Sequence, residues 1–378
     1  MKLTSPNVQL SAALKSACST SRAHLFLIAF IVVVTCCFYF SGNSLPSPTG
    51  LFVKDRGSQT VSDLRQLSGQ RVEKKGNVLQ QHWKPDNAFN DSILQVLEKR
   101  YAERLRRAEK VCSQQEPALK NRFWSIASNE VDGKPRACST RQCTILLDKT
   151  NLIYYCFVQK VASTAIKTYF LKITNKTTAH SAHDNVTAFH IEANDAITRI
   201  SPMFYSRQKR QHFYKIIFVR HPFARLVSAY ENKVLGPRDK LSFFFNNYWD
   251  KAMKKYRGVE QLDSDARPTF EEFVRYLLDT PVYKYDSHWV PYTKRCQPCL
   301  VHYDFIGKLE TAEQDFHYVF QHELGLTETP AVENRGATTG DKVMFYFRQV
   351  PKSEILRLYY TYKMDFDIFG YEVNDFLK

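Results

Sequence analysis

The sequence predicts an α/β domain, with a mostly parallel central sheet flanked by helices, behind one N-terminal transmembrane helix. Two patterns indicate this fold class: short apolar runs alternate with amphipathic helical repeats, and one uncharged apolar segment precedes them all. The composition agrees, because 44% hydrophobic and 14% aromatic residues in a chain of 378 can build a sizeable core. A fully disordered chain is therefore excluded.

The apolar runs are typical of buried parallel strands, since they are short, continuous and rich in β-branched and aromatic residues. They cover residues 152–158, 215–219 and 300–307. Apolar residues at helical spacing indicate helices at 92–111, 163–173, 223–234, 270–278, 310–324 and 353–364. Strands that alternate with helices in this way favour a parallel sheet with helices on both faces.

The N-terminal apolar segment predicts the compartment. Residues 25–40 read LFLIAFIVVVTCCFYF, and the uncharged span covers about 18 residues. Three basic residues and no acidic residue precede it, so the positive-inside rule places the N-terminus in the cytosol and the remainder in the lumen. We expect a cytosolic tail at 1–22, a signal anchor at 23–42, a stem at 43–110 and a lumenal domain at 111–378. A cleaved signal peptide is the alternative.

Six cysteines follow the span, an even number that favours disulfides in an oxidising lumen, although the pairing cannot be read from the sequence. They are Cys112, Cys138, Cys143, Cys156, Cys296 and Cys299. The last two also resemble half a zinc site or a redox pair, but no second such pair or spaced histidine partner occurs. Acceptor sequons for N-glycosylation lie at Asn90, Asn175 and Asn185, as expected of a lumenal chain.

The formal net charge of +15 suggests an acidic partner, such as a nucleotide, a membrane surface or an acidic polysaccharide. The expected lumenal topology excludes nucleic acid. Two basic clusters are candidates for tracking an acidic polysaccharide, with a merely solvated surface as the alternative. They comprise Arg207, Lys209 and Arg210, and then Lys251, Lys254, Lys255 and Arg257.

The first predicted strand leads directly into a candidate anion site. The segment Gln159-Lys-Val-Ala-Ser-Thr164 separates it from the helix expected at 163–173. A helix N-terminus presents free N–H groups and the positive end of the helix dipole. Ser163 and Thr164 add hydroxyl groups and Lys160 adds a charge. The pattern GxxxxGK[ST] is absent, which disfavours an ordinary ATPase or GTPase, and simple capping of the helix by Ser163 or Thr164 is the alternative.

The second predicted strand also ends in a basic residue, Arg220. Pro222 suits the first turn of the following helix, and Ser228 lies about two turns further on. Ligands bind open α/β sheets at the carboxyl ends of the strands, and a guanidinium can bind a phosphate through two parallel hydrogen bonds. In isolation, a surface arginine and a helix-interior serine are the alternative.

Together, these segments resemble the 5′-phosphosulfate and 3′-phosphate loops of sulfotransferases that use 3′-phosphoadenosine 5′-phosphosulfate (PAPS). More closely, they are similar to the Golgi carbohydrate sulfotransferases of the HNK-1, chondroitin 4-O- and dermatan 4-O- type. The first loop reads QKVASTAIK where that family reads roughly PKVACTNWK, and the second reads VRHPFARLVSAYENKV where the family reads roughly VREPFERLVSAYRNKF. A third block, from Ser287-His-Trp through Cys296-Gln-Pro-Cys to Tyr303-Asp-Phe-Ile-Gly-Lys-Leu-Glu-Thr, matches as well.

The resemblance implies a P-loop-like sulfotransferase fold, a Golgi type II membrane enzyme and PAPS as co-substrate, with no metal. By resemblance, Lys160 bridges the leaving phosphate and the sulfuryl group, and Arg220 and Ser228 bind the 3′-phosphate. The 5′-phosphate would be held by the loop that comprises Val161, Ala162, Ser163 and Thr164. Departures occur at Gln159, at Ser163, at Ala165-Ile166 and at His221, where the family has Pro, Cys, Asn-Trp and Glu. Whether the chain forms a homodimer stays open.

A general base is needed to deprotonate the acceptor hydroxyl. His180 leads because it lies between the loops and matches an Ala-His pair of the family, and His288 is second because it belongs to the third block. The other candidates are His183, His190 and Glu192. The family favours a glycosaminoglycan acceptor, above all the 4-hydroxyl of GalNAc in chondroitin or dermatan. The alternatives are the glucuronic acid 3-hydroxyl of HNK-1-type glycans, N-glycan GalNAc, and a glycan-binding protein without turnover.

Overall fold

The computed structural model describes residues 91–114, 143–202, 207–331 and 340–378, and the fold is reported for these ranges. The predicted cytosolic tail, the signal anchor, the stem up to residue 90 and the sequon at Asn90 lie outside the described residues. Within the described ranges, no helix is long and apolar enough to cross a membrane.

The central sheet has five strands in the order β3-β1-β2-β4-β5. β2 (Ile153–Cys156), β4 (Tyr214–Val219) and β5 (Phe305–Lys308) are parallel neighbours and confirm the predicted runs, although β5 begins later than expected. β1 (Ile145–Asp148) pairs antiparallel with β2, and β3 (Arg199–Ile200) pairs antiparallel with β1. The sheet is therefore mixed, which corrects the expectation of a mostly parallel one.

A tight turn produces this antiparallel pair. The Asp148 carboxylate accepts hydrogen bonds from the backbone N–H groups of Thr150 (2.8 Å) and Asn151 (3.2 Å), and the chain then returns along β1 as β2. All four residues of β1 are buried, so its sequence Ile-Leu-Leu-Asp carries no alternating pattern. A four-residue strand without alternation gives little sequence signal, which is why it was not predicted.

Helices flank the sheet and continue beside it. They are α3 (Asp91–Ser113), α5 (Ser163–Ile173), α6 (Val186–Ala196), α7 (Arg207–Arg210), α8 (Pro222–Lys233), α9 (Ser242–Phe244), α10 (Asp250–Arg257), α11 (Phe270–Asp279), α12 (Tyr292–Arg295), α13 (Pro298–Val301), α14 (Ala312–Phe316), α15 (Gly340–Phe347) and α16 (Lys352–Phe369). Two π-helical segments, Phe245–Trp249 and His317–Glu323, continue α9 and α14. All the predicted helices occur within a few residues, and α16 extends five residues beyond its expected end.

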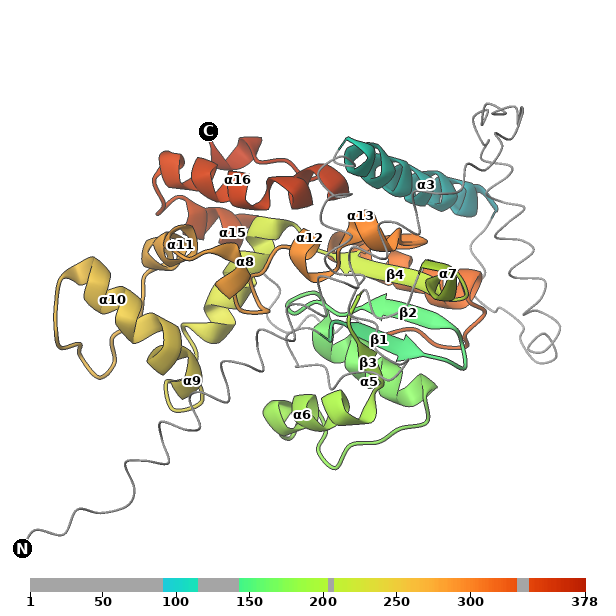
Figure 1. The fold of residues 1–378 in the computed structure, drawn as a ribbon, viewed down its shortest axis with the longest axis horizontal. Coiled ribbons are helices and arrows are strands. Elements are labelled where there is room, and N and C mark those ends of the chain that lie inside the picture. Colours follow the sequence, from blue (N-terminus) through green and yellow to red (C-terminus); the bar gives the residue numbers. More distant parts are fainter. Residues whose placement is uncertain (1–90, 115–142, 203–206, 332–339) are drawn as a thin grey trace, which may run out of the picture. The chain divides into compact units, whose positions relative to one another are not determined.

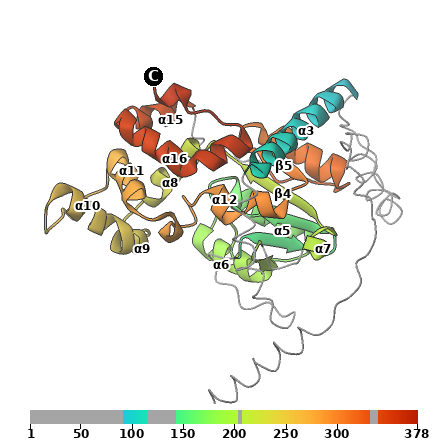
Figure 2. The same ribbon diagram turned by 45° about the horizontal axis from the view of Figure 1, so that its top comes forward.

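Two hydrophobic clusters make up the core of the described part. One surrounds the sheet and includes Tyr155, Ile216 and Phe170, and the other lies among α8, α11, α15 and α16 and centres on Trp249 and Trp289. Figures 1 and 2 show the helices of the second cluster, α8, α11, α15 and α16, beside the sheet. The helices α3 and α6 lie on opposite sides of the sheet (Figures 1 and 2). The carboxyl ends of β2 and β4 lead into the helices α5 and α8, at the junction of the two clusters.

The first described helix, α3, packs on this domain. Leu97 and Tyr101 are buried, and the Tyr101 hydroxyl donates to Asp315 Oδ1 (2.9 Å). Arg104 Nη1 donates to the other oxygen of the same carboxylate (2.5 Å). A disulfide between Cys112 and Cys299 ties the end of the helix to α13. Residues 91–110, which the sequence analysis assigned to the stem, therefore contact the folded domain in this structure.

Candidate active site

The loop after β2 presents an uncapped helix N-terminus. Lys160 and Ala162 have positive φ angles of 68° and 48°, and Ala162 is the left-handed N-cap of α5 without a side-chain capping bond. The N–H groups of the first turn of α5 therefore have no capping side chain, as an anion-binding loop requires. Ser163 and Thr164 are half-buried at this end, whereas the Val161 side chain is buried in the core and leaves only its backbone to the loop.

The loop after β4 places Arg220 beside the first loop. β2 and β4 are parallel neighbours, with Cys156 opposite Ile217, so both strands end at the same edge of the sheet. The Tyr292 hydroxyl accepts from the Arg220 N–H (2.9 Å) and donates to the Arg220 carbonyl (3.0 Å), which fixes the backbone at the strand end. His221 caps α8, since its Nδ1 accepts from the N–H of Phe223 (3.2 Å). Ser228 lies on the same helix, half-buried.

Both loops open into one large cleft of about 2800 Å³. Of the predicted PAPS-binding residues, those that line it are Lys160, Ala162, Ser163, Thr164, Arg220 and Ser228. The remaining walls come mainly from α5, the segment 175–187, α15 and the start of α16. The structure thus brings the two predicted loops together around one space large enough for a nucleotide and part of a second substrate.

The electrostatics of the cleft favour an anion. Burial, together with the nearby charges of Lys233 and Arg220, lowers the pKa of Lys160 to about 8. Burial also lowers the pKa of Arg220 and of Lys233. Basic side chains that are partly buried near one another repel, and a bound anion relieves that repulsion.

Two histidines lie within electrostatic reach of Lys160. His288 Nδ1 donates to Asp286 Oδ1 (2.5 Å), and the His288 side chain is 18% exposed. Burial lowers the pKa of His288 to about 4, although Asp286 opposes the shift. His190 Nε2 forms a hydrogen bond with the Thr164 hydroxyl (3.3 Å), and burial lowers its pKa to about 4 as well. Both rings are therefore neutral at neutral pH, and the bond to Asp286 leaves Nε2 of His288 as the proton acceptor.

His180 lies in a different environment. Its Nδ1 pairs with Glu192 Oε1 at 2.6 Å, and its side chain is 47% exposed. The Glu192 carboxylate also accepts from the His180 N–H (3.0 Å), so it is engaged locally. His183 lines the cleft in the same segment and is exposed as well. Of the predicted base candidates, His183 lines the cleft, whereas His180, His190, His288 and Glu192 do not. The charge of Lys160 contributes to the lowered pKa values of His190 and His288, after burial and other nearby charges.

The two basic clusters predicted from the sequence contribute no lining residue to the cleft in the described part of the chain. Lys255 pairs with Asp279 (2.6 Å), Arg257 pairs with Glu272 (2.7 Å), and Arg210 is buried. The cleft carries other cations instead, of which Lys240, Arg348 and Lys352 lie on its walls with exposed side chains. These cations form no basic cluster in the sequence, because two of them are far from the third along the chain, so the sequence does not indicate that they share a cleft.

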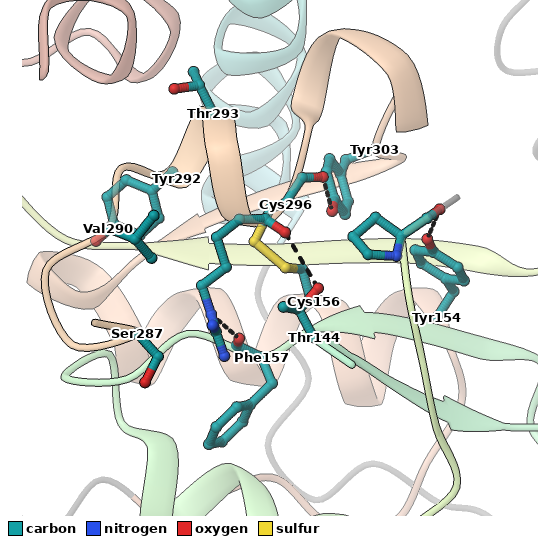
Figure 3. Close-up of a disulfide and its surroundings, with 12 residues drawn as sticks. Thr144, Tyr154, Cys156, Phe157, Ser287, Val290, Tyr292, Thr293, Cys296 and Tyr303 are labelled. Carbon is teal, nitrogen blue, oxygen red and sulfur yellow. Dashed lines mark hydrogen bonds between the residues drawn. A yellow bond between two sulfur atoms is a disulfide. The ribbon is translucent and has the colours of Figure 1, made fainter. Parts of the chain in front are cut away.

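A disulfide ties the first loop to the segment that carries His288. Cys156, at the end of β2, is bonded to Cys296, just after α12 (Figure 3). Arg295 Nε donates to the Phe157 carbonyl (3.0 Å), and the Arg295 carbonyl accepts from the Thr144 hydroxyl (3.2 Å). Cys143 is also disulfide-bonded. The expectation of disulfides is confirmed, and the Cys-Gln-Pro-Cys pair divides its sulfur atoms between two of them.

Two of the departures from the family pattern have structural explanations. Ile166 is fully buried in the sheet core, while Ala165 lines the cleft, so the position of the family's Trp faces the core here. His221 stands where the family has an acidic residue; it caps α8, and its N–H donates to Glu310 Oε1 (2.7 Å).

Several site residues were not predicted from the sequence. Lys233 lies in the second block that resembles the carbohydrate sulfotransferases, and Tyr292 lies in the third. Nothing in the sequence distinguishes them from other charged and aromatic residues of these blocks. Asp286, two residues before His288, forms an Asp-x-His pattern that could have indicated a carboxylate–histidine pair. Arg225 reads as one more charge in the second block, but its side chain is almost completely buried.

Comparison with known proteins assigns the class. The model described as the sulfotransferase family matches residues 144–372, which is more than half of the chain. The chain belongs to this family, and it is a sulfotransferase. Membership confirms the resemblance of the two loops and of the third block to carbohydrate sulfotransferases.

The relatives are carbohydrate sulfotransferases of several kinds. Carbohydrate sulfotransferase 11 of Mus musculus is 31% identical over 244 residues, which cover 62% of this chain and 68% of the relative. Carbohydrate sulfotransferase 14 of Danio rerio is 30% identical, with 71% and 70% covered, and carbohydrate sulfotransferase 10 of Gallus gallus is 29% identical, with 73% and 76% covered. No solved structure matches the chain.

Proposed function

We propose that this enzyme transfers the sulfuryl group of PAPS to a sugar hydroxyl of a glycosaminoglycan, specifically the 4-hydroxyl of GalNAc in chondroitin or dermatan. One observation carries the proposal: the two loops at the ends of neighbouring parallel strands open into one cleft, with Lys160 and Arg220 on its walls. An HNK-1-type glucuronic acid 3-hydroxyl or an N-glycan GalNAc is the alternative acceptor, because relatives of different kinds match about equally well.

The residues of the cleft fit PAPS at both of its phosphate ends. In the proposal, the N–H groups at the start of α5 hold the 5′-phosphate together with Ser163 and Thr164. Arg220 and Ser228 hold the 3′-phosphate, which distinguishes PAPS from ATP. When bound, PAPS supplies the sulfuryl group. Lys160 neutralises the charge that develops on the leaving phosphate, and a bound anion raises its pKa from about 8.

We assign the general base to His288 rather than to His180. Asp286 fixes the proton of His288 on Nδ1, so Nε2 can accept the proton of the acceptor hydroxyl, and the carboxylate then stabilises the imidazolium. His180 lies instead on the exposed segment between α5 and α6, where it is hydrogen-bonded to Glu192 of α6. His190 binds the Thr164 hydroxyl and is suited to orienting that hydroxyl toward the nucleotide.

The cations on the outer walls support an acidic acceptor. Lys240, Arg348 and Lys352 are exposed there and belong to no ion pair in the described ranges, so they are available to a carboxylate or sulfate. The signal anchor predicted at residues 23–42 and the family membership support the proposal of a Golgi type II membrane location for the reaction.

The test is sulfate transfer from radiolabelled PAPS by the detergent-solubilised full chain, across chondroitin, dermatan, a heparan precursor and N-glycan acceptors. We expect incorporation into chondroitin or dermatan, with 4-sulfated GalNAc among the released disaccharides. Arg220→Ala should lower the affinity for adenosine 3′,5′-bisphosphate about 10- to 100-fold, because a hydrogen-bonded charge pair is lost.

The outcomes separate the parts of the proposal. Transfer only to HNK-1-type or N-glycan acceptors would replace the acceptor and keep the chemistry. No binding of adenosine 3′,5′-bisphosphate by the folded chain would overturn the assignment of both loops.

A further inference from the structure

We propose that Arg225 is a positioning residue for sulfuryl transfer, and that its guanidinium group holds the nucleotide loop and the His288 segment in register. The inference deepens the proposed function and rests on it. Arg225 lies on α8 between Arg220 and Ser228, but it points into the protein and is 1% exposed.

The guanidinium binds three backbone carbonyls from two segments. Nε donates to the carbonyl of Gln159 (3.2 Å), in the nucleotide loop. Nη1 donates to the carbonyl of Val290 (2.6 Å), and Nη2 donates to the carbonyl of Ser287 (3.1 Å). These contacts span 62 to 66 residues of sequence, so Arg225 connects segments that have no strand pairing between them.

Each carbonyl lies beside a residue of the proposed reaction. Gln159 directly precedes Lys160, and the Ser287 and Val290 carbonyls lie on either side of His288 along the chain. Both segments are irregular, since residues 157–162 and 285–291 belong to no strand or helix. Their relative position therefore depends on side-chain contacts, and a displacement of about 1 Å in a reacting group can lower the rate about 100-fold.

Stability alone is a poor explanation of this residue. Arg225 forms no direct salt bridge in the described ranges. The carboxylate of Asp365 lies within electrostatic reach but accepts instead from the N–H groups of Tyr292 (2.7 Å) and Thr293 (2.9 Å). Burying a charge without a direct carboxylate contact is costly, and here the hydrogen bonds to three backbone carbonyls offset that cost. An arginine offers instead a planar fork with fixed angles between its donors, which a lysine does not have. The fork also stacks over the Tyr292 ring, 4.8 Å from its centroid, and Tyr292 in turn holds Arg220.

The variants for the test are Arg225→Lys, which keeps the charge but not the fork, and Arg225→Met, which keeps the length but not the charge. In the detergent-solubilised full chain we expect both to lower kcat about 100-fold. Their affinity for adenosine 3′,5′-bisphosphate should change less than about fivefold, because the strands β4 and β2 fix the positions of Arg220 and of the first turn of α5.

The matched control is Arg238→Lys. It disturbs one contact to the Asp250 carboxylate and one to the Ala266 carbonyl, both remote in sequence from the two segments. We expect it to change kcat less than about twofold.

A double-mutant cycle with His288→Gln separates positioning from a general loss of structure. If Arg225 acts by placing His288, Arg225→Lys should lower the single-turnover rate much less in the His288→Gln background than in the parent. The same 100-fold factor in both backgrounds, or a kcat within threefold of the parent, would overturn the proposal. Unfolding is monitored separately by binding of the bisphosphate. A parent that binds the bisphosphate but transfers nothing to any acceptor would refute the proposed function first, and the positioning role with it.

Discussion

The disulfide between Cys156 and Cys296 should stabilise both the fold and the nucleotide loop. It lies inside the larger ring closed by Cys112 and Cys299. When the Cys112–Cys299 disulfide is intact, the shorter path from Cys156 to Cys296 runs back to Cys112, across that disulfide, and from Cys299 to Cys296. This path has roughly 47 residues, so removal of the Cys156–Cys296 disulfide opens a ring of that size. The chain entropy of a ring of that size corresponds to about 4 kcal/mol.

The double variant Cys156→Ala/Cys296→Ala is therefore expected to lose about 4 kcal/mol in the free energy of unfolding, equivalent to about 8–16 °C in Tm. Thermal unfolding of the detergent-solubilised chain, followed by near-ultraviolet circular dichroism, measures this loss. The matched control is Cys112→Ala/Cys299→Ala, which opens the same ring and should lose a similar amount. Only the first variant should also bind adenosine 3′,5′-bisphosphate less tightly, because Cys156 is four residues from Lys160 and Cys112 is on α3.

The comparison can fail in two ways. A loss below about 1 kcal/mol for the inner disulfide would show that the ring argument does not apply to this chain. Equal loss of nucleotide affinity in both variants would show that the inner disulfide has no local role in holding the loop.

Two further predictions concern the site itself. The pH profile of kcat/KM for PAPS should be bell-shaped. Burial lowers the pKa of His288 to about 4, so this base stays neutral and active down to about pH 4. Burial lowers the pKa of Lys160 to about 8, so the charge of Lys160 is lost above about pH 8. An acidic limb near 6.5, the value of an unperturbed histidine, would contradict the assignment of His288. Tyr292→Phe should weaken binding of the bisphosphate about fivefold in a titration, because both hydrogen bonds to the Arg220 backbone are lost, whereas unchanged affinity would mean that β4 alone fixes Arg220.

The nucleotide end of the site could be predicted because local signals converge there. An apolar run followed by Lys160 and a helical pattern defines a strand, a loop and a helix, and α5 begins at Ser163 as expected. The same reasoning found β4, Arg220 and α8. Parallel neighbours end at the same edge of a sheet, so two such segments place their loops together without any knowledge of the rest of the chain.

The base and the acceptor walls could not be predicted in the same way. The sequence favours His180 because it lies between the two loops and matches an Ala-His pair of the family, and the structure places it on an exposed segment, paired with Glu192. His288 is separated from Lys160 by more than a hundred residues, and its segment is connected to α8 by Arg225, which donates to the Val290 and Ser287 carbonyls. The two basic clusters contribute no lining residue to the cleft in the described ranges, and the cations that do line it come from separate elements.

The segment that carries His288 is held by contacts other than strand pairing, and these contacts explain how it can place the proposed base accurately. Sheet hydrogen bonds fix β2 and β4, but the segment from Ser287 to Cys296 has no strand neighbour. It is held instead by the disulfide to Cys156, by the guanidinium groups of Arg225 and Arg295 on backbone carbonyls, and by the Asp365 carboxylate on backbone N–H groups. Apart from the disulfide, these ties bind backbone atoms, so the His288 side chain is not used to hold the segment in place. Substitutions at the buried ties should therefore affect the rate of transfer more than substitutions on the outer walls of the cleft, which should mainly change the affinity for the acceptor.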